Sequence, residues 1–290
     1  MTTDYQILLF YKFVNLEDPQ SLAVQQRAWC DELELTGRTI IAKEGINSTL
    51  EGSIENIEEF IKRMMSRAEF NDVHWKKSAG TGSAFPKLSI KVRDEIVTTM
   101  LEDNNEFGPH MNLTGKYIKP EELYDWIHSD KKFYIVDMRN DYEHDIGHFQ
   151  NSILPKELEN FRDLPKVLPL IENLKNETIV TVCTGGIRCE KASGFLIKHG
   201  FTDVYQLNGG IVSYMEKYPN RDFVGKLYVF DGRMAMAFNT NSPEHQIIGK
   251  CKLCQKKSEN IVDYYQPGLV SRKHGIICYE CIQNKMVILD

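Results

Sequence analysis

Apolar and polar positions in the N-terminal part of the chain switch between the two-residue period of strands and the longer period of helices. The apolar run at 5–13 predicts a strand. A helix is predicted to begin after Asp18, an N-cap, with Pro19 in its first position, and to end at Gly37. The predicted elements are strands at 5–13, 38–42, 46–50, 73–77 and 88–92 and helices beginning at Asp18 and Ser53. Without the last strand, their order is the β-α-β-β-α-β of the split βαβ, ferredoxin-like plan.

A polar stretch rich in helix breakers, EDNNEFGP at 102–109, predicts a linker after this part of the chain. Beyond the linker, strand and helix patterns alternate. Strands are predicted at 133–137, 178–183 and 204–207, and helices at 120–128, 142–146, 167–174, 190–199 and 211–217. Such alternation is typical of a parallel sheet covered by helices on both faces. Ligands of these sheets bind at the carboxyl ends of the strands.

The predicted strand at 178–183 ends on Cys183 and turns through Gly185 and Gly186 into a helix. The N–H groups of such a turn, the amino end of the helix and Arg188 place positive charge beside the sulfur. These surroundings lower the pKa of a thiol and favour its thiolate. A buried structural cysteine also fits a strand end, but the Gly-Gly turn and Arg188 favour a reactive one. Cys189, on the first helical turn, fits a packing role at least as well as that of a resolving thiol.

Composition narrows the class of protein. A chain of 290 residues is long enough for two or three domains, and 42% hydrophobic residues suffice for packed cores. No apolar run approaches the length of a membrane span, and the first residues lack the pattern of a signal peptide. Seven cysteines in such a chain argue against a disulfide framework and predict a cytoplasmic location. The net charge of −6 leaves nucleic-acid contacts to local basic patches.

Four of the cysteines form two CxxC pairs in the C-terminal tail: Cys251, Cys254, Cys278 and Cys281. Four thiolates in this arrangement suit tetrahedral Zn²⁺, and a short polar tail gains stability from a bound metal. The sequence therefore favours a structural zinc over the alternative of four free thiols in a mobile tail.

The same tail is basic. Between 249 and 273, six basic residues face two acids, which leaves a charge of +4. The basic residues are Lys250, Lys252, Lys256, Lys257, Arg272 and Lys273. With Tyr264 and Tyr265 between them, they suit the phosphates and unpaired bases of a nucleic acid. A solvated loop that keeps the tail soluble is the alternative.

Several strings in the chain resemble those of rhodanese domains. The string at 136–149 resembles the first rhodanese signature, 183–188 the active loop and 207–211 the closing signature. A narrower likeness comes from CTGGIRCEKAS at 183–193, KEGIN at 43–47 and VFDGR at 229–233. Together they are similar to the rhodanese-type tRNA uridine hydroxylases, and the likeness covers the chain from about Tyr5 to Arg233.

This resemblance implies both a fold and a reaction. The fold is an α+β ferredoxin-like domain (1–100), a linker (101–116), an α/β rhodanese domain (117–222) and a C-terminal extension with the two CxxC pairs (223–290). The reaction is hydroxylation of the wobble uridine of tRNA to 5-hydroxyuridine with molecular oxygen, and the partner is the tRNA anticodon loop.

Two other functions fit a rhodanese loop. A thiosulfate or persulfide sulfurtransferase would carry a cysteine persulfide on Cys183, whereas a binding module of this fold would not need the thiol. Four residues separate Cys183 from Arg188, as in sulfur-handling rhodaneses. The related dual-specificity phosphatases have five, so phosphatase activity is not expected.

The resemblance also implies the roles of individual residues. Cys183 and Arg188 are expected to be catalytic, and the backbone of Thr184, Gly185, Gly186 and Ile187 is expected to form the loop around the sulfur. Asp137 and Arg139 are expected to support the pocket. Asp137 could hold Arg188 or the loop backbone, or it could belong to a structural ion pair. Independently of the resemblance, the place of Glu143 near a helix start predicts a surface acid. Since the sequence shows no flavin or dinucleotide fingerprint, neither a flavin nor a nicotinamide cofactor is expected.

Overall fold

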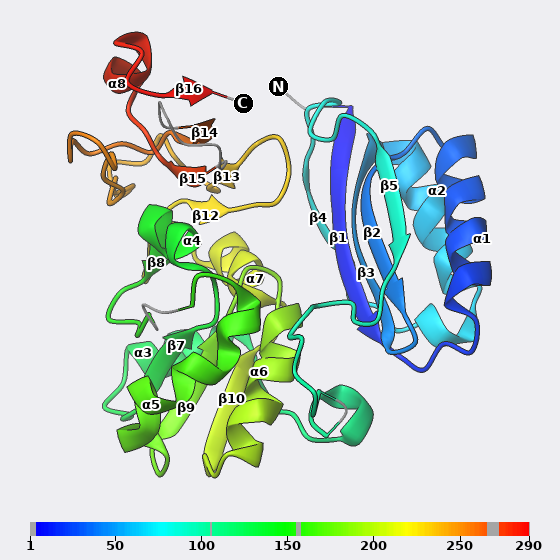
Figure 1. Cartoon of the computed structure of the whole chain (residues 1–290), viewed down its shortest axis with the longest axis horizontal. Helices are drawn as coiled ribbons and strands as arrows, with labels where there is room; N and C mark the ends of the chain where they lie inside the picture. The colour runs from blue at the N-terminus through cyan, green and yellow to red at the C-terminus, as the bar shows by residue number, and fades with distance from the viewer. Residues whose placement is uncertain (1–3, 105, 155–157, 266–272, 290) are drawn as a thin grey trace. The chain divides into compact units, whose positions relative to one another are not determined.

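The computed structural model describes residues 4–104, 106–154, 158–265 and 273–289 (Figure 1). The chain divides into two compact units, Met1–Leu113 and Thr114–Asp290. The division falls within 101–116, the segment predicted to be a linker. Among the described residues, no helix has both the length and the apolar character needed to cross a membrane.

The first unit is built on a five-stranded sheet. Its elements are β1 (Tyr5–Phe13), α1 (Pro19–Glu32), β2 (Thr36–Ala42), β3 (Gly45–Ser53), α2 (Ile54–Met65), β4 (Lys76–Ala79) and β5 (Leu88–Val92), with 3-10 helices at Ala68–Phe70 and Pro109–Met111. The strand order is β4-β1-β3-β2-β5, with β5 parallel to β2 and the other pairs antiparallel. Both helices cover one face of the sheet (Figure 1), over a core that includes the fully buried Phe10 and Phe60. The ferredoxin-like prediction is confirmed.

Two element boundaries in this unit differ from the prediction. Asp18 caps α1 as expected, because its side chain accepts a 3.0 Å hydrogen bond from a backbone N–H of the first turn. However, α1 ends at Glu32, so the prediction that Gly37 ends the helix is wrong. Gly37 lies in β2 with φ of 141°, and a Cβ there would meet the carbonyl oxygen of Thr49 at 2.2 Å. A glycine is needed because two strands approach closely. The strand expected at 73–77 begins later, as β4.

The second unit contains a parallel sheet. Its main elements are β6 (Lys116–Ile118), α3 (Pro120–Ile127), β7 (Tyr134–Asp137), β9 (Thr178–Val182), α6 (Ile187–Lys198), β10 (Asp203–Leu207) and α7 (Gly210–Lys217). The strands run parallel in the order β6-β10-β9-β7. Val180 and Val182 of β9 share a core with residues of α3 and α7. Ile179 is equally buried, and strand geometry turns it to the opposite face. Since α6 packs on β9 and β10, the predicted sheet with helices on both faces is confirmed.

Local backbone chemistry explains where this unit departs from the prediction. β6 lies partly in the predicted linker and extends the sheet at its edge. α6 begins at Ile187, earlier than expected, because Gly186 adopts a φ of 101° and turns the chain straight into the helix. In place of one helix at 167–174, α5 (Leu168–Ile171) lies between 3-10 helices at Phe161–Val167 and Glu172–Leu174. Pro165, within the first of these 3-10 helices, lacks the backbone N–H that a regular helix would use.

The C-terminal residues attach to the parallel-sheet part through short strands. The elements are α4 (Asp141–Ile146), β8 (Gly147–Phe149), β11 (Phe223–Gly225), β12 (Leu227–Tyr228), β13 (Ala235–Met236), β14 (Ile261–Tyr265), β15 (Lys273–Ile276), α8 (Tyr279–Gln283) and β16 (Ile288–Leu289). β11 pairs with β8, β12 with β13, and β14 lies between β15 and β16. Tyr142 of α4 lies 5.1 Å from the ring of Tyr228 and 5.2 Å from that of His274. The extension therefore packs directly on α4.

Candidate functional site

The sulfur of Cys183 lies between the end of β9 and the start of α6. The backbone N–H of Gly186 donates a hydrogen bond of 3.2 Å to Cys183 Sγ. The amino end of the 12-residue helix α6 follows at once, so its unpaired N–H groups add partial positive charge to the loop. This is the arrangement of strand, loop and helix that the sequence predicted for a thiolate.

The charge around Cys183 favours ionisation in spite of burial. Its side chain has no exposed surface, and burial by itself would raise the pKa of the thiol. A hydrogen bond from the Cys189 side chain, the charge of Arg188 and the backbone N–H groups of Cys189 and Gly186 outweigh burial and lower the pKa of Cys183 to about 6. Burial and the neighbouring Cys183 sulfur raise the pKa of Cys189 well above its ordinary value. Cys183 is therefore the thiolate and Cys189 its protonated donor.

Arg188 is held by Glu143. Its guanidinium donates to the two carboxylate oxygens at 2.6 and 2.8 Å, and the two side chains are 8% and 0% exposed. The prediction that Glu143 is a surface acid is therefore wrong. Glu143 also accepts the backbone N–H of Asn140 at 3.0 Å, which caps the start of α4 and turns the carboxylate inward. Sequence reasoning missed this residue because the cap pattern does not reveal which way the carboxylate points.

Asp137 and Arg139 form a separate ion pair without exposed surface. Arg139 Nη2 lies 2.7 Å from Asp137 Oδ2, and the same nitrogen donates to the carbonyl of Gly147 at 2.7 Å. The pKa of Asp137 stays below its usual value, since the charge of Arg139 outweighs burial. The alternative in which Asp137 holds Arg188 is wrong, because Glu143 occupies that position. The structural ion pair fixes the end of β7 to the start of β8.

The start of α7 is hydrogen-bonded to the backbone of the active loop. The N–H groups of Ile211 and Val212 donate to the carbonyls of Cys183 and Thr184 at 2.9 and 3.1 Å. Gly210 has φ of 72°, and a Cβ at this position would lie 2.6 Å from backbone atoms of Gly185 and Gly186. The carbonyls of Cys183 and Thr184 are thus turned toward α7. The N–H of Gly186 in the loop points instead toward the sulfur of Cys183.

Phe230 is a second residue at the site to which sequence reasoning gave no role. Its ring centroid lies 5.8 Å from the guanidinium carbon of Arg188, and 51% of the residue is exposed. Phe230 belongs to VFDGR, a string that contributed to the family resemblance. The only signal in the sequence was the place of Phe230 in this string, because its exposure and its contact with Arg188 appear only in the structure.

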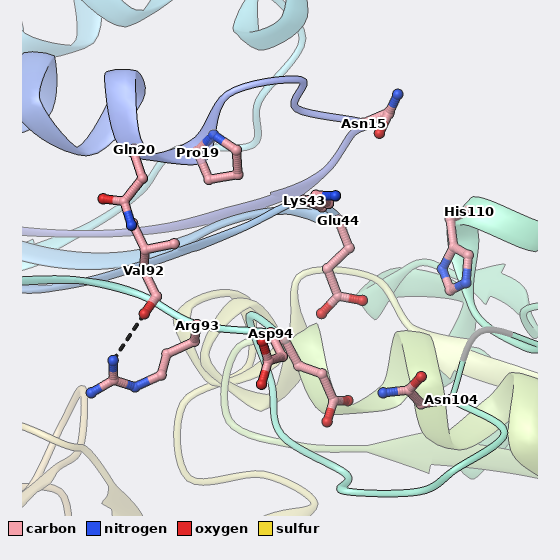
Figure 2. A pocket seen from close by; sticks show the side chains of 11 residues that line it. Asn15, Pro19, Gln20, Lys43, Glu44, Val92, Arg93, Asp94, Asn104 and His110 are labelled. Atoms are coloured by element: carbon pink, nitrogen blue, oxygen red, sulfur yellow. Dashed lines mark hydrogen bonds between the residues drawn. The ribbon is translucent and has the colours of Figure 1, made fainter.

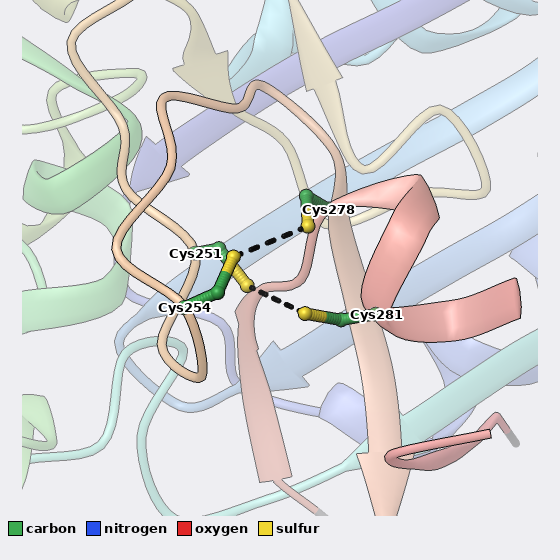
Figure 3. A group of neighbouring side chains, drawn as sticks. All are labelled: Cys251, Cys254, Cys278 and Cys281. Atoms are coloured by element: carbon green, nitrogen blue, oxygen red, sulfur yellow. Dashed lines mark hydrogen bonds between the residues drawn. The ribbon is translucent and has the colours of Figure 1, made fainter. Parts of the chain in front are cut away.

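The four cysteines of the tail meet at one point (Figure 3). Their sulfur atoms all lie within 4.8 Å of one another, with 3.8 Å between Cys251 and Cys281 and 3.5 Å between Cys254 and Cys278. Tetrahedral Zn²⁺ with Zn–S bonds of about 2.3 Å requires S–S distances of about 3.8 Å. The sulfur positions therefore fit a metal ion of this type, and the predicted ligand set is brought together.

The basic residues of the tail do not form one uniform patch. Lys252 pairs with Asp145 and Lys256 with Glu280. Lys250 and Lys257 are exposed, and Lys273 belongs to β15. Arg272 lies outside the described residues. Pairing with acids reduces the positive charge that the sequence alone suggests.

A cavity of about 640 Å³ lies in the first unit, between the start of α1, the β2–β3 turn and the segment after β5 (Figure 2). Lys43 and Glu44 of the KEGIN string line it. Glu44 accepts the N–H of Ile96 at 2.7 Å, and Asn47 donates to the carbonyl of Ile96 at 3.0 Å. The KEGIN string thus fastens the segment after β5 and shapes this cavity.

Family models match three segments of the chain. Residues 5–96 match the UPF0176 acylphosphatase like domain, 119–217 the Rhodanese-like domain and 224–287 the Rhodanase C-terminal model. The Rhodanese-like match contains β9, the active loop and α6, and the C-terminal match contains the four clustered cysteines.

Curated relatives match almost the whole chain. The tRNA uridine(34) hydroxylase of Bacillus thuringiensis (strain Al Hakam) is 40% identical over 282 residues, which are 96% of this chain and 85% of that protein. The tRNA uridine(34) hydroxylase of Bacillus licheniformis is 40% identical over 283 residues, which are 97% and 85% of the two chains. Among solved structures, a rhodanese-like domain protein from Staphylococcus aureus is 28% identical with a TM-score of 0.29, and the match covers 34% of this chain and 90% of that chain.

Proposed function

The chain belongs to the tRNA uridine(34) hydroxylase family, and on that premise we propose that it hydroxylates the wobble uridine of tRNA to 5-hydroxyuridine with molecular oxygen. The observation that carries the proposal is the position of the Cys183 sulfur at the end of β9, where the backbone N–H of Gly186 donates to it at 3.2 Å and the charge of Arg188 helps to lower its pKa. The family resemblance drawn from the sequence motifs is confirmed by relatives that span both units.

In the proposed reaction, the thiolate is a nucleophile. Cys183 Sγ forms a bond to C6 of the uracil ring, and the electron pair of the C5–C6 double bond moves to C5. C5 then bonds to one atom of O₂. Two electrons from a thiol reductant and two protons release the other oxygen atom as water. Loss of the C5 proton restores the double bond and expels the Cys183 thiolate, which leaves a hydroxyl on C5.

The proposed roles of the loop follow from the charge that develops. The backbone N–H of Gly186 and the protonated Cys189 stabilise the thiolate before attack and after its release. Arg188, fixed by Glu143, adds a positive charge near the uracil carbonyl groups. Because Cys183 has no exposed surface, the rim of the loop must move to admit the base. An unpaired anticodon base costs less to extrude than a paired one.

A persulfide sulfurtransferase is the second candidate. The four-residue loop between Cys183 and Arg188 favours it, because the same N–H groups that hold a thiolate would hold a persulfide anion. It gives no reason for a match that extends over the first unit, where residues 5–96 belong to a separate family model. We therefore rank it below hydroxylation.

The remaining proposals concern the parts around the loop. We assign residues 1–100 and 117–222 to the ferredoxin-like and rhodanese domains and 223–290 to an extension that carries a structural Zn²⁺ on its four cysteines.

The anticodon loop is the expected partner. Lys250 and Lys257, which are exposed, are the residues of the tail most suited to its phosphates. A tRNA substrate and a thiolate kept reduced agree with a cytoplasmic location.

The test is an analysis of tRNA by mass spectrometry. Cells lacking the gene are compared with cells rescued by the wild-type chain or by Cys183→Ser. We expect 5-hydroxyuridine at the wobble position only with the wild-type chain, in a strain without another pathway to that nucleoside. Normal 5-hydroxyuridine with Cys183→Ser would contradict the proposal. Thiocyanate release from thiosulfate and cyanide by the pure protein, without any change in tRNA, would favour the sulfurtransferase.

A further inference from the structure

The β12–β13 hairpin presents an aromatic ring beside the active loop. Phe230 is 51% exposed, although it lies in a part of the chain whose neighbours Tyr228 and Asp231 are buried. On one side the ring lies 5.8 Å from the guanidinium carbon of Arg188, the residue that flanks Cys183 in the loop. Single exposed apolar side chains are common on protein surfaces, so the significance of this ring lies in its contact with Arg188 of the active loop.

The backbone under Phe230 is rigid. The N–H of Val229 donates to the carbonyl of Met234 at 3.0 Å, and the N–H of Met234 donates to the carbonyl of Asp231 at 2.9 Å. The carboxylate of Asp231 accepts from Arg233 Nε at 2.8 Å and from Arg233 Nη2 at 2.7 Å. These bonds close the turn, so the position of the Phe230 ring is set by the hairpin.

Two contacts also fix the orientation of the ring. The Tyr228 ring meets it edge to face, with centroids 5.0 Å apart and planes at 83°. Arg188 provides the second contact. Tyr228 in turn packs against Tyr142 of α4, the residue next to Glu143. The ring is therefore pre-ordered by the elements that hold the active loop, while half of it remains available to a ligand.

The chemistry of the surroundings fits a single-stranded RNA. Met234 of the same hairpin lines a cavity of about 490 Å³, together with Lys257, Glu259 and Tyr279, the last of which is 71% exposed. Arg233 also lines this cavity, but its guanidinium is paired with Asp231. Basic side chains beside exposed aromatic rings suit phosphates and unpaired bases. Arg188 lies over one face of the Phe230 ring, so a flat pyrimidine would stack on the other face, one ring away from the residue that closes the active loop.

We propose that Phe230 is the stacking platform that receives the extruded pyrimidine and positions it for Cys183. This inference rests on the proposed function and adds a positioning residue to it. Stacking on an aromatic residue does not depend on the identity of the base, so Phe230 contributes affinity and orientation. Stacking on Phe230 also offsets the stacking free energy that the base loses when it leaves its neighbouring bases in the anticodon loop.

The test measures RNA binding without oxygen, so that no turnover occurs. The probes are an anticodon stem–loop with uridine at position 34 and the same stem–loop with an abasic nucleotide there. The variants are Phe230→Leu, Phe230→Trp and the control Phe238→Leu, which removes another exposed ring of the same unit. Melting temperature and the pH titration of the Cys183 thiol show whether each variant keeps the fold and the loop.

We expect Phe230→Leu to weaken binding of the uridine stem–loop by about 10- to 100-fold and to leave binding of the abasic stem–loop unchanged. Phe230→Trp should bind both probes as the wild-type chain does, and so should Phe238→Leu. Equal losses for both probes, or no loss for either, would overturn the stacking role. So would a wild-type chain that binds both probes equally. The proposed function is judged separately, by 5-hydroxyuridine formation with the wild-type chain, and it stands if only the Phe230 variants behave unexpectedly.

Discussion

Glu143 and Arg188 form a buried, two-point ion pair, with nitrogen–oxygen distances of 2.6 and 2.8 Å. One partner stands at the start of α4 and the other in the first turn of α6. The pair therefore joins two elements that are far apart in the sequence and fixes the guanidinium beside the active loop. Arg188 serves both Cys183 and Glu143, so its position determines the electrostatics of the site.

Glu143→Gln should destabilise the fold. The substitution leaves the buried charge of Arg188 without its counter-ion, which costs about 3 to 5 kcal/mol when one partner of a buried pair is removed. Chemical denaturation measures the change in the free energy of unfolding. Glu122→Gln, on the exposed surface of α3, is the matched control and should change it little. An equal effect of the two substitutions would show that the buried pair does not stabilise the fold.

The ionisation of Cys183 should appear in the pH dependence of stability. Its pKa is about 6 in the folded chain, below the ordinary value of 9.0, so the folded state favours the thiolate. The stabilisation is complete above pH 9.0 and is lost as the pH falls through about 6. The difference in melting temperature between the wild-type chain and Cys183→Ser, measured against pH, should therefore grow from acid to alkaline conditions. Thiolate absorbance in the ultraviolet should show the same midpoint, and a midpoint near 9.0 would contradict the role of the loop.

Gly210→Ala should displace the active loop. The new Cβ would lie 2.6 Å from backbone atoms of Gly185 and Gly186, and backbone cannot rotate away as a side chain can. Gly200→Ala is the control, because Gly200 also has a positive φ, of 90°, but has nothing within 4 Å of its Cβ position. We expect about 1 kcal/mol of destabilisation for Gly200→Ala and clearly more for Gly210→Ala. Only Gly210→Ala should raise the pKa of Cys183. Similar effects at both positions would mean that backbone conformation, not the close approach, requires the glycine.

The tail should bind about one zinc ion per chain. Metal analysis of the freshly purified wild-type chain should find it. Cys251→Ser and Cys278→Ser should lose the metal, whereas Cys183→Ser should retain it, since Cys183 is not among the clustered ligands. A chelator should lower the melting temperature of the wild-type chain. Metal-free protein that gains no stability from added zinc would refute the prediction.

Local sequence patterns predicted the elements of the active loop well. A β-branched strand, a cysteine, two glycines and a helix follow one another within 178–198, so their arrangement depends on short-range geometry. The two CxxC pairs also allowed the four metal ligands to be predicted, because the spacing within each pair is local. In both cases the chemistry is carried by residues that are neighbours in the sequence.

Long-range packing accounts for what could not be predicted. Glu143 looked like a helix-start acid, and only the contact with α6 shows that its side chain points inward. Gly37 looked like the end of a helix, although its role is to admit the backbone of β3 at close range. The tail lysines looked like a positive patch, but Asp145 and Glu280 pair with Lys252 and Lys256. The predictions for Glu143 and Gly37 were wrong, whereas the role of the tail lysines stays a prediction, and in all three cases the missing information was a partner from elsewhere in the fold.

The packing of Tyr142 between Tyr228 and His274 has a consequence for how the protein can be divided. Helix α4 carries Glu143, which orients the guanidinium of Arg188, and it packs on aromatic rings of the C-terminal extension. The part of the chain that the active site needs therefore extends well beyond β10, the last strand of the parallel sheet. A fragment that ends at residue 222 would keep Cys183 and lose Tyr228 and His274, the rings that support the helix holding Arg188. Since the cysteine cluster belongs to the same extension, we expect its disruption to change the pKa of Cys183 as well.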